Sequence, residues 1–219
     1  MKKKQVLSRK QLALRRLAIA AVLMVLINHF FLLGLIFPRQ CIWKLEEREG
    51  ARHTSVVTRD WAPEIHKTHL VYLTENDETT LFGSTYLSVY GWFAGFSVAL
   101  DCSEEAPLYA GRSYMSRDDG RIMYFFGRVD DPAIETVEIS LRSQEWNEAA
   151  QAPFYREIRR LSTAKLLEKD GRRYFLQRDS GEWDNETCSP PWPVAIGYDS
   201  AGNEVARVDI MQGNASHFG

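Results

Sequence analysis

The chain has 219 residues, of which 45% are hydrophobic and 12% aromatic, and its formal net charge is −2. These values are typical of a globular protein with its own core, and they exclude a wholly disordered chain. The length that remains after a short N-terminal segment suits one domain.

The charge is unevenly distributed along the chain. Residues 1–16 contain seven of the 27 basic residues and no acidic residue, so the remainder holds 20 basic and 29 acidic residues, a balance of −9. An acidic domain repels nucleic-acid phosphates, so we expect no nucleic-acid partner. The basic tail is instead typical of a membrane-topology signal.

An apolar run follows the basic tail. Leu17–Phe37 contains no Asp, Glu, Lys or Arg. As a helix the run would be about 31 Å long, which matches a hydrocarbon core of roughly 30 Å. It is longer than a signal-peptide core, and no small-x-small cleavage site follows it, so it predicts an uncleaved transmembrane signal anchor.

The positive-inside rule then sets the topology. It predicts a single-pass protein of the cell membrane with a cytoplasmic N-terminus and an extracytoplasmic C-terminal domain. The expected segments are a basic tail at 1–16, the anchor at 17–37, a connector at 38–68, a β-rich domain at 69–211 and a flexible tail at 212–219. Within the connector, a helical extension through Glu49 would end at Gly50.

Short apolar runs separated by turn signals predict about nine strands. In Thr136–Leu141, apolar residues alternate with polar ones, which is typical of a half-buried strand. Asp170-Gly171 predicts a hairpin turn. The spacing indicates a mainly β fold, an antiparallel sandwich-like domain or a partly open barrel. The expected strands are His69–Leu73, Thr85–Tyr90, Phe96–Leu100, Ile122–Phe126, Thr136–Leu141, Ala164–Leu167, Arg173–Leu176, Val194–Tyr198 and Glu204–Ile210.

One helix is expected inside the β-rich domain. Phe154, Ile158 and Leu161 follow an i, i+4, i+7 pattern, which favours a helix over Pro153–Leu161. Its basic residues, Arg156, Arg159 and Arg160, would form a solvated face.

The stretches FGRVDDPAIETVEISL, DGRRYFL and VAIGYDSAGNEV carry a resemblance. Over roughly Tyr86 to Val208 the chain resembles small signal-anchored extracytoplasmic proteins of Gram-positive bacteria, which have a β-sandwich-like domain. The resemblance implies a location and a fold, and it transfers no catalytic residue. The matched features are Gly127, Asp131-Pro132, Tyr174, Phe175, Tyr198-Asp199 and Gly202.

Three cysteines allow two hypotheses. An oxidising environment would permit a disulfide between Cys102 and Cys188, although spacing cannot show that they are neighbours. Cys41 follows the anchor, so it would be either a free thiol or a bridge between two copies in a homodimer.

Two aromatic groups are candidate binding residues. Tyr90 ends one expected strand, and Trp92 and Phe93 follow it between Gly91 and Gly95. The three would form either a ligand or partner surface or part of the core. Trp183 and Trp192 flank a proline-rich segment that would be a contact surface or a lid.

Metal and cofactor chemistry has little support in the sequence. His66 and His69 are three residues apart, but an expected strand at His69 would turn them to opposite faces. We therefore expect no metal site and no cofactor. No GxSxG elbow is present, and the many carboxylates follow no selective spacing.

These observations favour an anchored extracytoplasmic module that binds a protein or envelope component, as an accessory or sensory subunit, without enzymatic activity. One alternative is a cell-envelope hydrolase with paired carboxylates. Another is a structural membrane protein that dimerises through its helix and Cys41.

Overall fold

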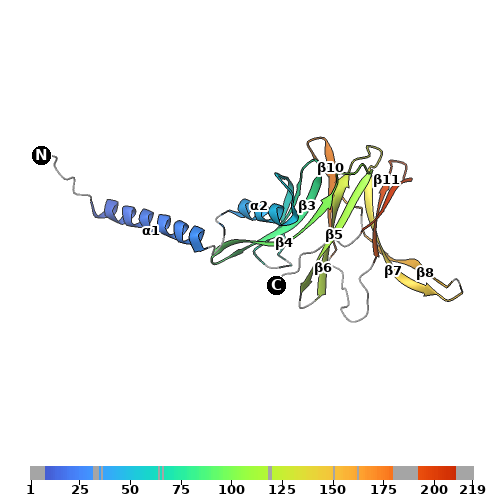
Figure 1. Cartoon of the computed structure of the whole chain (residues 1–219), viewed down its shortest axis with the longest axis horizontal. Coiled ribbons are helices and arrows are strands. Elements are labelled where there is room, and N and C mark those ends of the chain that lie inside the picture. The colour runs from blue at the N-terminus through green and yellow to red at the C-terminus, as the bar shows by residue number, and fades with distance from the viewer. Residues whose placement is uncertain are drawn as a thin grey trace.

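The structure, a computed structural model, describes residues 8–31, 35, 37–63, 65, 67–117, 120–149, 151–161, 163–179 and 192–210. Within these ranges, two N-terminal helices precede twelve strands in three four-stranded antiparallel sheets (Figure 1). The mainly β, antiparallel fold is therefore confirmed. The sequence did not predict the third sheet.

The three sheets form mostly in chain order. The exception is β9 and β10, which come after β7 and β8 of sheet C but belong to sheet B. Sheet A has the order β1-β2-β3-β4, sheet B the order β5-β6-β10-β9, and sheet C the order β12-β11-β7-β8. The strands are β1 (Ser55–Trp61), β2 (His69–Glu75), β3 (Thr79–Ser88), β4 (Gly91–Asp101), β5 (Leu108–Arg117), β6 (Gly120–Val129), β7 (Thr136–Asn147), β8 (Ala152–Arg160), β9 (Leu166–Lys169), β10 (Arg172–Asp179), β11 (Trp192–Tyr198) and β12 (Glu204–Asp209).

Sheet B is the central layer, and strand β6 shows why. Ile122, Tyr124 and Phe126 pack into a buried cluster with residues of sheet A. Met123 and Phe125 pack into a second cluster with residues of sheet C. Because both faces are buried, Ile122–Phe126 of β6 is a continuous apolar run without the alternation of a half-exposed strand.

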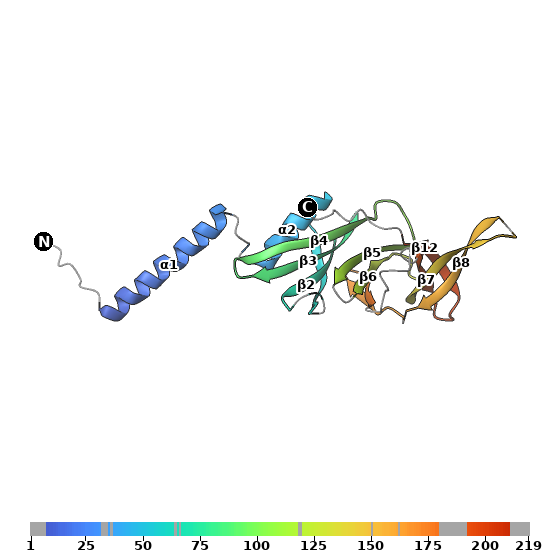
Figure 2. The ribbon, with the colours of Figure 1, turned by 90° about the horizontal axis from the view of Figure 1, so that it is seen from below.

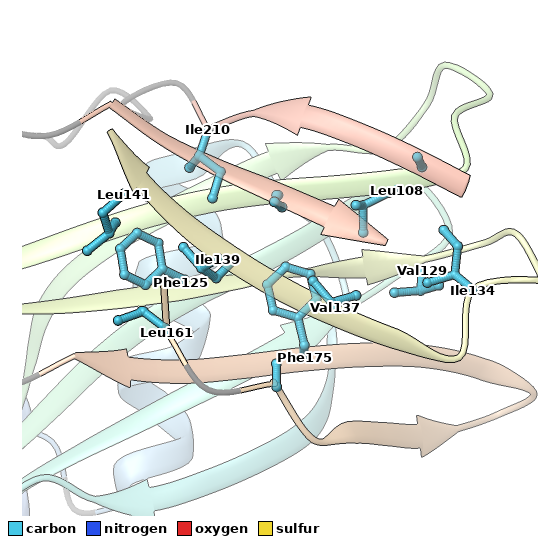
Figure 3. Packing of buried hydrophobic residues seen from close by; sticks show 14 of the residues in the cluster. Leu108, Phe125, Val129, Ile134, Val137, Ile139, Leu141, Leu161, Phe175 and Ile210 are labelled. Carbon is cyan, nitrogen blue, oxygen red and sulfur yellow. The ribbon is translucent and has the colours of Figure 1, made fainter. Parts of the chain in front are cut away.

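The larger core lies between sheets B and C (Figure 3). Phe125 and Phe175 of sheet B and Ile139 and Leu141 of sheet C are all fully buried there. Burial of each such side chain stabilises the fold by roughly 1.5–3 kcal/mol. The apolar residues whose alternation predicted a strand at 136–141 thus face sheet B.

The helix α2 (Pro38–Glu49) covers the outer face of sheet A (Figure 2). Its buried residues include Cys41, Ile42 and Leu45, and the helix ends at Gly50, whose φ of 70° is left-handed. The predicted stop at Gly50 is confirmed. Residues 38–68, expected as a connector, contain α2 and β1 and belong to the folded domain.

Polar side chains also fix α2 to the sheet. Arg48 Nη1 donates a hydrogen bond to the Gly95 carbonyl at 2.7 Å, and Ser97 Oγ donates one to Glu49 Oε1 at 2.7 Å. The buried Glu46 accepts a hydrogen bond from the Thr54 backbone N–H at 3.0 Å. Helix and sheet therefore form one unit.

The helix α1 (Arg9–Phe31) stands apart from the domain (Figure 1). No described helix is both long and apolar enough to cross a membrane. Large apolar side chains are exposed along α1, namely Leu12, Leu14, Leu17, Ile19, Val22, Leu23, Met24, Val25, Leu26 and Ile27.

The predicted helix over Pro153–Leu161 is wrong, because this segment is strand β8, paired antiparallel with β7. A strand also places residues 154 and 158 on one face, so the apolar spacing fitted both structures. Hydrogen bonds from β7 decide between them. The strands predicted from the sequence also did not include β1 and β5.

The predicted Asp170-Gly171 hairpin is confirmed. Both residues have positive φ, 49° and 79°, as a type I′ turn between β9 and β10 requires.

Candidate functional site

The turn between β3 and β4 is an exposed apolar tip. Ser88 pairs with Gly91, so Val89 and Tyr90 form a two-residue turn. The side chains are 41% exposed at Leu87, 93% at Val89 and 61% at Tyr90. We call these three residues the tip surface. Of the predicted group Tyr90, Trp92 and Phe93, the turn exposes Tyr90 most.

Aromatic side chains brace the tip from behind. Tyr86 stacks on His69 at 5.2 Å between ring centroids and on Phe93 at 5.5 Å, which forms a ladder across β2, β3 and β4. Trp92 is partly buried against a cluster that includes Ile42 of α2. Phe93 and Trp92 therefore serve mainly as packing residues, which was the alternative left open by the sequence.

The tip is also joined to the segment that follows α1. The Leu35 N–H donates to the Trp92 carbonyl at 2.7 Å, and the Trp92 N–H donates to the Leu35 carbonyl at 2.8 Å. This reciprocal pair is a short antiparallel bridge. It places the tip surface beside residue 35, far from it in sequence.

A second exposed group lies on sheet C, at the end of the domain farthest from α1 (Figure 1). Phe154, Tyr155 and Ile158 of β8 and Trp192 of β11 are all exposed. The Tyr155 and Trp192 rings meet edge to face at 6.0 Å. Tyr155 and Trp192 share one face of sheet C, while Phe154 and Arg156 point to the other face of the same edge strand. We call these residues, together with Ile158, the edge surface.

The edge surface includes an edge strand with a backbone edge that no described strand pairs. β8 is the last strand of sheet C, and among the described residues only β7 pairs with it. An unpaired strand edge presents N–H and C=O groups that can bond another extended chain. The Arg156 side chain is 69% exposed and forms a long 3.7 Å ion pair with Glu145.

A charged network covers the outer face of sheet C beside the edge surface. Arg160 bonds Glu157 at 3.0 Å and Glu138 at 3.3 Å, and Ser140 Oγ donates to Glu157 at 2.6 Å. These hydrogen bonds, first from Arg160 and then from Ser140, lower the pKa of Glu157. The Arg142 guanidinium lies 5.2 Å over the Tyr155 ring and also pairs with Asp209 at 2.6 Å.

A buried polar cluster joins sheets A and B. Glu75, at the end of β2, accepts a hydrogen bond from Ser55 Oγ at 2.8 Å and lies 3.5 Å from Lys169 Nζ and 3.8 Å from Arg172 Nη1. Burial first, and then the nearby Glu75, raise the pKa of the Tyr174 hydroxyl. Each charge here has an opposite partner, which is typical of a structural cluster.

The described cysteines are both buried free thiols. Cys41 is fully buried between α2 and sheet A, and burial raises the pKa of its thiol to about 11. A bridge between two copies would require α2 to leave the sheet, so the structure does not favour the Cys41-linked dimer. Cys102 donates to Thr80 Oγ1 at 3.6 Å. Cys188 lies outside the described residues, so the Cys102–Cys188 pairing stays a prediction.

Catalytic and metal chemistry gains no support from the described residues. They contain no group of three or more His, Cys, Asp or Glu side chains placed to hold a metal ion. A hydrolase acid needs a raised pKa. The pKa values of Asp101, Glu157, Asp199 and Glu204 are lowered instead, mainly by hydrogen bonds.

The predicted binding residues therefore do not form one site. Tyr90, Trp92 and Phe93 lie on sheet A, whereas Trp192 lies on sheet C. Trp183 is outside the described residues, as is His66. The sequence analysis did not identify Tyr155 and Phe154 as candidate binding residues. The adjacent aromatic pair, typical of strands, was the signal that could have identified them.

Comparison with known proteins finds no matching family model, no matching curated protein and no matching solved structure. The resemblance to extracytoplasmic proteins of Gram-positive bacteria stays a prediction, so the function has to be argued from the geometry.

Proposed function

We propose that this protein is a membrane-anchored, extracytoplasmic binding module whose edge surface takes an extended, acidic segment of a partner protein in the cell envelope. The observation that carries the proposal is the outer edge of β8, which no other described strand pairs, with exposed aromatic side chains and Arg156 beside it. It supports a function by contact, as an accessory or sensory subunit.

The anchor is supported by the exposed apolar surface of α1. A helix with apolar side chains all round is unfavourable in water unless something covers it. In sequence, the apolar run continues past Phe31, the last residue of α1, to Phe37, and seven basic residues precede the run. These features favour insertion in lipid with the N-terminus in the cytoplasm.

The partner's chemistry follows from β8 itself. An added strand would bond the backbone groups of β8 that no described strand pairs. It would also place alternate side chains beside Tyr155, whose ring lies against Trp192. The strand carries three arginines and one glutamate between residues 156 and 160, within a domain that is otherwise acidic. Charge complementarity therefore favours acidic residues in the partner.

Membrane attachment and topology are tested in intact cells and spheroplasts. We expect the full-length chain to float with membranes and to resist alkaline carbonate extraction. We also expect protease added outside to digest the β domain. Recovery of the chain in the soluble fraction would contradict the anchor, and protection of the domain would contradict the orientation.

The edge surface is tested by photocrosslinking in cells. A benzophenone amino acid replaces Phe154, and the same probe at Ala201, an exposed residue in the β11–β12 turn, is the control. We expect one crosslinked product at position 154 that is absent at 201. Arg156→Glu should reduce it about tenfold, which corresponds to about 1.4 kcal/mol, and Arg156→Lys should largely retain it. Equal products at both sites, or no effect of charge reversal, would overturn the proposal.

A further inference from the structure

We infer that the tip surface lies in the membrane–water interface, with Val89 and Tyr90 in contact with lipid. This inference rests on the proposed anchor and adds a second point of membrane contact. The occupant of the tip surface is the bilayer itself.

The position follows from the backbone bridge between Leu35 and Trp92. Leu35 lies two residues before Phe37, the end of the apolar run. Two residues span at most about 7 Å. The polar zone on each side of the hydrocarbon core is about 5–8 Å thick. If the run is in lipid, its end at the outer surface therefore brings Trp92 and the adjoining turn to the interface.

The composition of the hairpin fits that location. No charged residue occurs from Thr79 to Leu100, which covers both strands up to Asp101, although 26% of the chain is charged. A solvent-exposed turn in water would normally carry polar residues, whereas this one exposes Leu87, Val89 and Tyr90. Tyrosine and tryptophan are enriched at the interface because their rings are apolar and their polar groups can reach water.

The tip is also held in place before it meets lipid. The His69–Tyr86–Phe93 ladder supports it on one face, and Trp92 packs against the α2 cluster on the other. A preorganised surface loses little conformational entropy on binding. Two fixed points, the anchor and the tip, would restrict rotation of the domain and would direct the edge surface away from the membrane (Figure 2).

Spin-label accessibility tests the inference on the full chain in vesicles of zwitterionic phospholipid. Val89→Cys carries a nitroxide label, Ala201→Cys is the water-exposed control, and Cys188→Ser is present in both variants. The parent chain that carries only Cys188→Ser shows whether the nitroxide reagent also labels the buried Cys41 and Cys102. We expect the label at 89 to be at least threefold more accessible to oxygen, and less accessible to a nickel chelate, than the label at 201. Anionic lipid should change neither value, because the tip is uncharged.

The outcomes separate the two proposals. If the chain floats with the vesicles but the labels at 89 and 201 are equally accessible to the nickel chelate, the tip is in water and this inference is overturned. If the chain does not associate with the vesicles, the anchor itself fails. If the label at 89 is shielded from both reagents, a protein contact covers the tip, and the assignment to lipid is wrong.

Discussion

Gly127 shows the constraint that the central sheet places on a single residue. It lies in β6 between Ala110 of β5 and Phe175 of β10. A Cβ atom at this position would collide with the Tyr109 carbonyl oxygen and the Phe175 ring. Neither neighbour can move freely, because one is backbone and the other is a fully buried side chain.

We therefore expect Gly127→Ala to lower the free energy of unfolding by about 3 kcal/mol, at the upper end for an overpacked core. Urea denaturation of the full chain in detergent measures the change. Gly171→Asn is the control, since this turn glycine has a φ of 79° that asparagine tolerates and open space around it. Equal stability of Gly127→Ala and the parent would show that β5 and β10 do not crowd position 127 so closely.

Cys41 gives a second prediction at the residue scale. Its thiol is fully buried and its pKa is raised to about 11, so it is neither accessible nor ionised near neutral pH. In a Cys188→Ser background, we expect maleimide labelling to be at least about 100-fold slower in buffer than in urea. A non-reducing gel should show monomer. Rapid native labelling, or a dimer that Cys41→Ser removes, would restore the bridged-dimer hypothesis.

At the scale of elements, the edge strand β8 is held by ion pairs to sheet B and within its own sheet. Arg159 pairs with the buried Asp179 of β10 at 2.8 Å, while Arg160 pairs with Glu157 and with Glu138 of β7. The arginine guanidinium groups thus connect β8 to β10 of sheet B and to β7 of its own sheet. The charges explain why this strand can stay at an edge with exposed aromatic side chains without a covering element among the described residues.

The lowered pKa of Glu157 makes this element sensitive to acid. Its ordinary value is 4.5, and the folded value is lower because Arg160 and Ser140 bond the ionised form. The stabilisation is therefore complete above pH 4.5 and is lost as the pH falls through the lower, folded value. We expect the stability difference between the parent and Glu157→Gln to shrink from neutral pH to about pH 3. Denaturation curves across this range measure it, and Glu168→Gln, at an exposed site on β9, is the control. A constant difference would contradict the assignment.

At the scale of the whole molecule, the layers follow the order α2, sheet A, sheet B and sheet C (Figures 1 and 2). Sheets A and B enclose one core, and sheets B and C enclose the other. The tip surface is at the α1 end and the edge surface is at the opposite end. This arrangement suits a module that is held at one end and binds at the other.

The layer order predicts where the folded domain begins. A chain that starts at Pro38 keeps α2 on sheet A, and we expect it to unfold in one cooperative transition. A chain that starts at Ala51 exposes the apolar face formed by Leu70, Tyr72 and Leu81, so we expect aggregation or loss of cooperativity. Circular dichroism during heating and limited proteolysis compare the two. Equal cooperativity would show that α2 is dispensable.

The amino-acid sequence by itself determined the features that depend on near neighbours. Alternation of Val137, Ile139 and Leu141 predicted a strand, Asp170-Gly171 predicted a hairpin, and Gly50 predicted a helix end. Each of these signals acts over a few residues, through side-chain spacing or through the φ angles that a residue allows.

Only the tertiary structure decided which strands pair and which sheets stack. β8 had a pattern that suits a helix or a strand, and its pairing with β7 settled the choice. β5 has little alternation, in part because Gly111 lies where the Leu100 and Phe126 side chains leave no room for a larger residue. The contact of Leu35 with Trp92 and that of Tyr155 with Trp192 join segments distant in sequence. Such contacts depend on the free energy of the whole packed chain, and no local pattern encodes them.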